Sequence, residues 1–397
     1  MDNSVKQTHP VTVGLLTLPY GIALGWASGT LPTTLEQHGF LPVPATMVAA
    51  LGLSLYTWQI LAAPFVDLSL SLRRWYLIGL ALSISGVLPF FWLPLKSDIS
   101  DLMKGLVGVS QFGALLMLLA STGCMARYIS ANKMGRASGW YQVGITGGQG
   151  VAIISILTLS SAFSWKIVFL AELLLMLTGI YAFYLLPVVR PEIKVPIRVA
   201  VAEVLFEGRS WIRSSKGIFT CLMALSPIGI GAATVGWNNG FQLYAIPENE
   251  MRLVIGPLSI VCSLAGFLVG GWASDRYGRW ATWLRAGGLL ALMSLLIAFC
   301  PFIHWLFDAG LLCYAFLSGF CAAAFWAIIM QSVSPLFAVT KIALLSMLLG
   351  ISFSYMRAFD GSVCDDFSFQ VMLLGEALLS FLFIGIALLL RRKLRIQ

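Results

Sequence analysis

The stretch Gly271-Trp272-Ala273-Ser274-Asp275-Arg276-Tyr277-Gly278-Arg279 lies between two long apolar runs and has the pattern G-x-x-x-D-R-x-G-R. A short, charged loop between two membrane-spanning helices has a physical role. The carboxylate of Asp275 can accept hydrogen bonds from the N–H groups of a neighbouring helix end, and Gly278 allows a turn with a positive φ. Arg276 and Arg279 suit the anionic cytoplasmic surface of a membrane. The alternative is a generic charged loop with no specific partner.

The composition excludes a soluble protein. Of the 397 residues, 59% are hydrophobic and 11% are charged, whereas charged residues make up about 25% of an ordinary soluble domain. The sequence therefore predicts an all-α polytopic membrane protein. The seven cysteines have neither metal-site nor disulfide spacing, so we expect no metal and no cofactor. We also expect no nucleic-acid partner, because the basic residues follow the membrane topology.

The apolar runs set the number of membrane spans. A helix needs about 20 apolar residues to cross a bilayer. With a cytoplasmic N-terminus, most of the Lys and Arg residues fall in cytoplasmic segments, as membrane topology requires. We therefore expect both termini to be cytoplasmic, in a bacterial inner (plasma) membrane. Twelve transmembrane helices are predicted, at 11–34, 43–66, 75–94, 103–126, 138–159, 164–186, 217–240, 251–272, 282–303, 305–330, 339–357 and 367–390.

A polar segment divides the chain into two six-helix halves. Residues 1–187 form the N-terminal half, 188–216 a cytoplasmic linker and 217–397 the C-terminal half. Within the linker the apolar residues recur at helical spacing, which predicts an amphipathic helix on the inner leaflet. The alternative is a disordered linker. The periodic residues are Ile197, Val201, Val204 and Leu205.

The two halves repeat several local patterns. Paired six-helix halves are typical of transporters that rock around a central site. The repeats are Pro19-Tyr20-Gly21-Ile22 with Pro227-Ile228-Gly229-Ile230, Gly25-Trp26-x-x-Gly29 with Gly236-Trp237-x-x-Gly240, Asp67 with Asp275, and Glu172 with Glu376.

The nine-residue pattern resembles the loop signature of the major facilitator superfamily, which joins the second and third helices of each half. The first half carries a degraded copy, with Ala63 at its first position and Leu68 in place of an arginine. The resemblance implies a twelve-helix fold with gating loops at both places. The residues to which it assigns this gating role are Asp67, Arg73, Arg74, Gly271, Asp275, Arg276, Gly278 and Arg279.

The first half is further similar to the AmpG muropeptide permease and acetyl-CoA transporter branch, and certain siderophore permeases look alike there. The similarity rests on Leu18-Pro19-Tyr20-Gly21, Ala63-Pro64-Phe65-Val66-Asp67 and Trp165-Lys166-Ile167-Val168-Phe169-Leu170. There is one departure. Muropeptide permeases carry acidic residues at the end of the fourth helix, where this chain has Ser121-Thr122-Gly123-Cys124-Met125-Ala126-Arg127.

The resemblance implies a central cavity lined by the first, fourth, seventh and tenth helices. Polar groups there can bind a solute, because unsatisfied polar groups in a bilayer are costly. Each tryptophan could instead be an interface anchor or a packing residue, and the asparagine pair could stabilise a helix break or a helix contact. The candidates are Tyr20, Trp26, Gln111, Trp237, Asn238, Asn239, Tyr314 and Trp326, with Gln142 on the fifth helix.

Two carboxylates, Glu172 and Glu376, fall within the predicted spans. Carboxylates inside a membrane often belong to proton relays, although a structural role for both is the alternative. Asp308, near the outer end of the tenth helix, is a third candidate for proton coupling.

These features predict a secondary active transporter that moves an organic solute by alternating access, coupled to protons. We expect a monomer surrounded by membrane lipids. The deep part of the bundle is poor in fixed charge, which favours a neutral, zwitterionic or aromatic solute. A transporter-like receptor or sensor is one alternative. A membrane-embedded acyltransferase is another, but none of the three histidines lies in the middle of a predicted helix, so we do not expect an enzyme.

Overall fold

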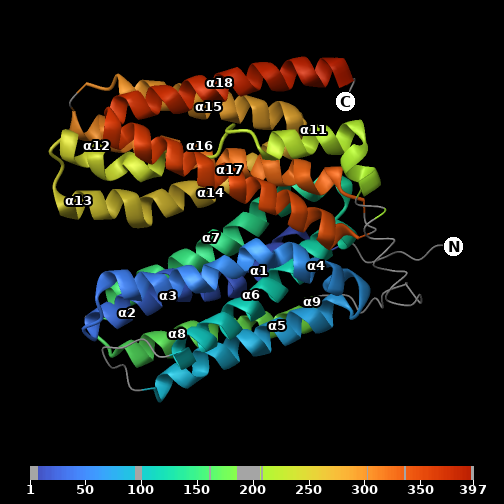
Figure 1. Ribbon diagram of the computed structural model, residues 1–397, viewed down its shortest axis with the longest axis vertical. Coiled ribbons are helices and arrows are strands. Elements are labelled where there is room, and N and C mark those ends of the chain that lie inside the picture. Colours follow the sequence, from blue (N-terminus) through green and yellow to red (C-terminus); the bar gives the residue numbers. More distant parts are fainter. Residues whose placement is uncertain are drawn as a thin grey trace. The chain divides into compact units, whose positions relative to one another are not determined.

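The computed structural model describes residues 8–93, 101–160, 162–185, 206, 209–301, 303–334 and 337–394. Throughout these ranges the chain forms helices and short connections, with no β-strand (Figure 1). The predicted all-α class is confirmed. The predicted amphipathic segment falls almost wholly outside the described residues, so it and the boundaries of the linker remain predictions.

The helices follow one another along the chain in the order shown in Figure 1. In the first part they are α1 (Pro10–Gly25), the π-helical turn Trp26–Thr30, α2 (Leu31–Gln37), α3 (Pro42–Ser54), α4 (Gln59–Leu68), α5 (Leu72–Val87), α6 (Asp101–Tyr128), α7 (Met134–Leu159), α8 (Trp165–Met176) and α9 (Ala182–Leu185). In the second part they are α11 (Ser215–Ala224), α12 (Trp237–Leu243), α13 (Glu248–Leu253), α14 (Ser259–Tyr277), α15 (Arg279–Ala298), α16 (His304–Ser332), α17 (Ala338–Asp366) and α18 (Phe369–Leu394).

Nine stretches of the described chain are long and apolar enough to cross a membrane. The three other predicted spans each fall on more than one helical element. The span 43–66 is divided by the 3₁₀ turn Leu55–Trp58, and 164–186 by the 3₁₀ turn Leu177–Tyr181. The span 217–240 is divided most completely, since α11 ends at Ala224 and α12 begins only at Trp237.

The prediction of one continuous helix over 217–240 is wrong for a local reason. Gly229 has a φ of 72° and Gly231 a φ of 68°, values that residues other than glycine rarely adopt. A Cβ atom at Gly229 would also overlap the side chain of Cys321. The same Pro-x-Gly-Ile pattern around Pro19 stays within the uninterrupted α1, so surrounding packing, rather than the pattern, decides the break.

The chain forms two compact units. Unit 1 consists of Met1–Ser130, Trp140–Val204 and Ser334–Ala343. Unit 2 consists of Ala131–Gly139, Leu205–Val333 and Leu344–Gln397.

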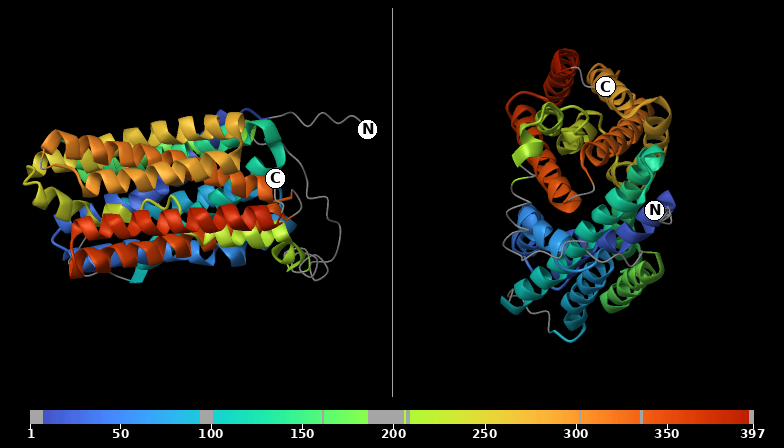
Figure 2. Two further views of the ribbon diagram at one scale, coloured as in Figure 1. Left: turned by 90° about the horizontal axis from the view of Figure 1, so that it is seen from above. Right: turned by 90° about the vertical axis from the view of Figure 1, so that its right-hand side faces the viewer.

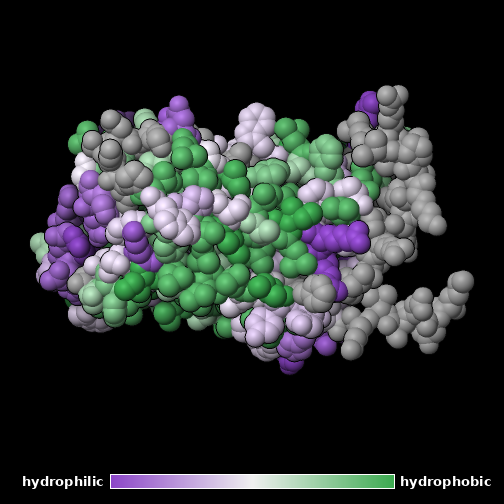
Figure 3. All heavy atoms as spheres, turned by 90° about the horizontal axis from the view of Figure 1, so that it is seen from below, coloured by the Kyte–Doolittle hydropathy of each residue, from purple (hydrophilic) through white to green (hydrophobic). Residues whose placement is uncertain are grey.

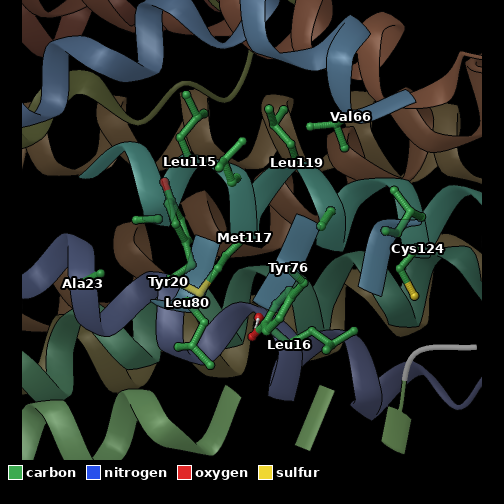
Figure 4. Close-up of a cluster of buried hydrophobic side chains, with 14 of the residues drawn as sticks. Leu16, Tyr20, Ala23, Val66, Tyr76, Leu80, Leu115, Met117, Leu119 and Cys124 are labelled. Atoms are coloured by element: carbon green, nitrogen blue, oxygen red, sulfur yellow. Dashed lines mark hydrogen bonds between the residues drawn. The ribbon is translucent and has the colours of Figure 1, made fainter. Parts of the chain in front are cut away.

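Unit 1 is organised around α1, α5 and α6. Tyr76 on α5 donates a hydrogen bond from its hydroxyl to the carbonyl of Leu16, at 2.8 Å. Around this bond, the side chains of Tyr20, Leu80 and Met117 form a buried apolar cluster (Figure 4). A second core holds Trp26, whose ring makes edge contacts with Phe90 and Phe169.

Unit 2 has its own aromatic core. α15 packs against both α16 and α18 (Figure 2). Tyr244, after α12, stacks on Phe307 of α16 with ring centroids 4.2 Å apart, and Phe307 contacts Phe369 of α18. These contacts anchor α12 to the unit despite the break before it.

Large hydrophobic side chains are exposed along the helices. The face drawn in Figure 3 is largely hydrophobic across its middle, with hydrophilic residues gathered toward its ends. Such extensive exposure is unusual for a monomer in water but normal for a surface in contact with lipid tails. Examples from four helices are Leu61, Leu157, Leu296, Leu378 and Leu389.

Candidate functional site

The charged signature segment is helical rather than a loop. Residues up to Tyr277 belong to α14, α15 begins at Arg279, and Gly278 alone makes the turn between them. Its φ of 87° is the positive value that the sequence predicted. The predicted nine-residue loop is therefore wrong in extent, because the apolar helix continues through Asp275 to the glycine.

Asp275 caps the beginning of α7 within unit 2. Its Oδ1 accepts a hydrogen bond from the backbone N–H of Gly135 at 2.6 Å, and its Oδ2 accepts one from the N–H of Arg136 at 3.0 Å. The Arg136 side chain adds an ion pair at 3.2 Å. The first N–H groups of a helix lack partners in their own helix and carry partial positive charge, so a carboxylate satisfies both needs.

The neighbouring signature residues have different surroundings. Arg279 donates a hydrogen bond to the carbonyl of Ala131, just before α7. The guanidinium of Arg276 lies over the ring of Tyr277, 5.9 Å from its centroid. Gly271 lies so close to Gly135 that a Cβ atom would meet the carbonyl of Gly135 at 2.5 Å. The signature thus joins α14 to the start of α7.

Asp67 makes the corresponding arrangement within unit 1. Its Oδ2 accepts hydrogen bonds from both the backbone N–H and the hydroxyl of Thr340, each at 2.9 Å, and its Oδ1 accepts one from the N–H of Val339 at 3.4 Å. These groups belong to the first turn of α17. The Asp67 side chain is fully buried and pairs with Arg127 at 2.8 Å.

The arginine that pairs with Asp67 is Arg127, at the end of α6. Arg127 lay outside the predicted gate, and the gating role assigned to Arg73 and Arg74 stays a prediction. Arg74 is exposed at the start of α5, where its backbone N–H is capped by Ser71. Sequence spacing did not indicate that α6 packs against α4.

Three solute candidates of unit 1 are core residues in this structure. Trp26 and Gln111 have no exposed surface, and Tyr20 has little. Gln111 donates a hydrogen bond from its side-chain amide to the carbonyl of Ala23, at 3.0 Å. The expectation that Trp26 stacks on a solute is not supported, because Phe90 and Phe169 enclose its ring. Gln142 on α7 is half-buried.

The candidates of unit 2 gather around α12. Asn238 and Asn239 are exposed, and the side-chain amide of Asn239 donates to the sulfur of Cys364 at 3.2 Å. Trp237 is buried and meets the ring of Tyr314 edge-on, at 5.1 Å between centroids. Trp326, nearer the C-terminal end of α16, is half-buried. Exposed amides therefore lie beside a buried aromatic pair.

Glu376 on α18 is hydrogen-bonded to Tyr314, one member of this aromatic pair. Its Oε1 accepts a hydrogen bond from the hydroxyl of Tyr314 at 2.5 Å, and its Oε2 accepts one from the hydroxyl of Ser294 at 3.1 Å. All three side chains are buried. The structure thus connects Glu376 through Tyr314 to Trp237.

Glu172 on α8 has a comparable setting in unit 1. Its Oε1 accepts hydrogen bonds from the hydroxyls of Thr30 at 2.7 Å and Ser155 at 2.8 Å. Its Oε2 is buried without a partner among the described residues. Asp308, the third candidate, lies near the start of α16 and interacts electrostatically with Glu250 and His304.

A further buried carboxylate, Asp360, escaped the sequence analysis. The eleventh span was predicted to end at residue 357, but α17 continues to Asp366, so Glu172 and Glu376 are not the only carboxylates within the spans. Asp360 has no exposed surface. A signal was present, since Asp360 follows Ser155 by almost the same number of residues as Glu376 follows Glu172.

Comparisons with solved structures identify the fold. FucP, a fucose:proton symporter of E. coli, is 16% identical in its outward conformation, with 96% of this chain and 98% of that chain covered and a TM-score of 0.70. The human organic anion transporter MFSD10 is 17% identical, with 95% and 98% covered and a TM-score of 0.70. The proton:xylose symporter XylE is 13% identical, with 97% and 95% covered and a TM-score of 0.64.

A family comparison extends over most of the sequence. Residues 13–354 match the family described as the Major Facilitator Superfamily, whereas no curated protein matches the sequence. The fold of this family has twelve membrane-spanning helices, and nine stretches of the described chain are long and apolar enough to be among them. Its members are integral membrane transporters and not enzymes. The chain therefore belongs to the major facilitator superfamily.

Proposed function

We propose that this protein is a proton-coupled secondary active transporter that moves an organic solute by alternating access. It would act as a lipid-embedded monomer in a bacterial inner membrane, with both termini cytoplasmic. The observation that carries the proposal is the arrangement in unit 2 in which the exposed Asn238 and Asn239 follow Trp237 on α12, the ring of Trp237 contacts Tyr314, and Tyr314 donates to the buried Glu376.

This series of residues offers a physical link between the binding of a solute and the binding of a proton. An amide offers both donors and acceptors to a solute. A solute that displaces Trp237 also displaces Tyr314, because the two rings are in contact. Tyr314 donates the shortest hydrogen bond to Glu376, so its movement changes how strongly that carboxylate holds a proton. Solute occupancy and proton occupancy are thereby linked through one hydroxyl.

The chemistry of the series also limits the solute. Neither α12 nor α16 contains a lysine or an arginine. A strongly anionic solute would leave its charge uncompensated beside these helices. A neutral, zwitterionic or aromatic solute fits exposed amides beside an aromatic pair. The similarity to the AmpG branch adds muropeptides to the solutes to be tested, although the fourth helix lacks the acidic residues of those permeases.

The two helix-end carboxylates fit the role of gates. α7 belongs to unit 2 up to Gly139 and to unit 1 from Trp140, and α17 passes from unit 1 to unit 2 after Ala343. Asp275 and Asp67 hold the first turns of these two helices. As gates, these carboxylates would set the position of the first turns of α7 and α17 during alternating access.

Uptake by the purified full-length protein in vesicles tests the proposal. A solute is first identified by the rise that it causes in the unfolding midpoint. With an imposed pH gradient, the wild type should accumulate that solute above its external concentration, and Glu376→Gln should not. Glu36→Gln, at an exposed position, is the matched control and should behave as wild type.

Two results would contradict the proposal. Binding without any uptake would identify a receptor. Accumulation that ignores the pH gradient would exclude proton coupling.

A further inference from the structure

Asp360 is the least satisfied polar side chain in unit 2. It is fully buried in α17, and neither of its carboxylate oxygens has a hydrogen-bond partner in the described part of the chain. An ionised carboxylate in such a place would be very costly. Asp360 therefore needs either a cation or a proton.

The groups with which Asp360 interacts in the described part of the chain are acidic or neutral, and Arg357, three residues earlier on the same helix, is exposed with its guanidinium over the ring of Phe353. It interacts electrostatically with Glu376 on α18 and with Tyr314 on α16. On its own helix it interacts with Cys364, one turn away. α15 contributes Ser294, which is bonded to Glu376. These interactions bring no positive charge to Asp360, so they favour the proton.

The helices that carry Asp360 and Glu376 approach each other closely next to these residues. A Cβ atom at Gly375 would meet the ring of Phe359 at 3.2 Å. Phe359 precedes Asp360 on α17, and Gly375 precedes Glu376 on α18. The glycine therefore permits the close approach of two helices at the level of the two carboxyl groups.

The internal repeat relates Asp360 and Glu376 to a hydrogen-bonded pair in the first half. In unit 1 the hydroxyl of Ser155 donates to Glu172 at 2.8 Å, and Asp360 and Glu376 occupy the corresponding positions of the second half. A serine always has a proton to donate, whereas an aspartate has one only when it is protonated. The second half thus replaces a permanent donor with a donor that depends on a bound proton.

We propose that Asp360 and Glu376 form a carboxyl pair that holds one proton between them, and that this pair is the proton-carrying site of the transporter. The second statement rests on the proposed function. When the proton is bound, the Asp360 carboxyl, which has no hydrogen-bond partner within the described ranges of the structure, turns to donate to the Glu376 carboxylate, and the pair carries one negative charge. When the proton leaves for water, the pair carries two charges, and their repulsion favours reprotonation. Tyr314 keeps its own proton throughout.

Infrared spectroscopy of the full-length protein in lipid nanodiscs tests the shared proton without any solute. Protonated carboxyl groups absorb separately from carboxylates. At neutral pH, Asp360→Asn should remove one protonated-carboxyl band, whereas Glu376→Gln should shift the frequency of that band without removing it, because the buried Asp360 still needs a proton. The double variant should remove no more than Asp360→Asn alone. Asp366→Asn, an exposed change on the same helix, should keep the band.

Other outcomes would overturn the pair. If neither variant removes a band, both groups are ionised. If the double variant removes two bands, each group holds its own proton. Should Asp360→Asn fold poorly, Asp360→Ser restores the donor found in the first half and should lose the band in the same way.

Uptake then separates the pair from the proposed function. In vesicles with an imposed pH gradient, Asp360→Asn should lose solute accumulation while Asp366→Asn keeps it. Full accumulation by Asp360→Asn would show that the pair does not carry the transported proton. If the infrared result holds but the wild type accumulates no solute, the shared proton stands and the transport proposal fails.

Discussion

At the scale of residues, Asp275 and Asp67 each accept hydrogen bonds from the first turn of another helix, and the sequence could predict only some of these contacts. The role of Asp275 as an acceptor for a helix end could be predicted from its spacing within the nine-residue pattern, and the structure supplies the donors, Gly135 and Arg136. Its counterpart Asp67 could be placed by the repeat, but its ion pair with Arg127 could not. That contact depends on how α4 and α6 pack, which no local pattern encodes.

Removal of the Asp275 cap should loosen the start of α7. Asp275→Ala leaves the N–H groups of Gly135 and Arg136 without an acceptor, and loss of such a cap costs about 1 kcal/mol. Hydrogen exchange measured by mass spectrometry should become faster in the first turn of α7 and remain unchanged in α18. Asp101→Ala, which removes an exposed ion pair with Lys104, is the control.

Equal exchange rates in Asp275→Ala and the wild type would show that the capping bonds contribute nothing to the order of this helix end.

At the scale of helices, the apolar runs predict most spans to within a few residues, and they fail at 217–240 and at the end of 339–357. The prediction of α16 was accurate to within two residues at each end, because the apolar run and the helix coincide. The break between α11 and α12 was missed, since glycine occurs both in continuous helices and in left-handed turns. The end of α17 was missed because polar residues follow 357, and with it Asp360 was missed.

The break depends on Gly229. Gly229→Ala forces a left-handed conformation on a residue with a Cβ atom, at a cost of roughly 1–2 kcal/mol, and adds an overlap with Cys321. The unfolding midpoint should fall. Adding Cys321→Ala should restore only part of the loss, because it relieves the overlap and not the backbone strain.

Gly385→Ala is the matched control, since a Cβ atom there meets no other atom within 4 Å. It should leave the midpoint unchanged or raise it slightly. A Gly229→Ala protein as stable as this control would show that the break does not require a left-handed residue.

At the scale of the whole molecule, composition and the signature were sufficient for the fold and the family. Twelve spans follow from apolar length, and membership of the superfamily follows from residues 13–354. The site is harder to predict, because helix position alone does not distinguish a buried side chain from an exposed one. Trp26 and Trp237 occupy repeated positions, yet only Trp237 contacts the tyrosine that leads to a carboxylate.

The most direct test of the account measures protons and solute together. Full-length protein is reconstituted into vesicles that contain a pH-sensitive dye, with the membrane potential clamped, and an inward gradient of the identified solute is applied. Solute entering the wild-type vesicles should carry protons and acidify the interior. Tyr314→Phe, which keeps the ring beside Trp237 but removes the hydroxyl bonded to Glu376, should reduce the protons moved per solute. Solute uptake with no change of internal pH in the wild type would contradict the account.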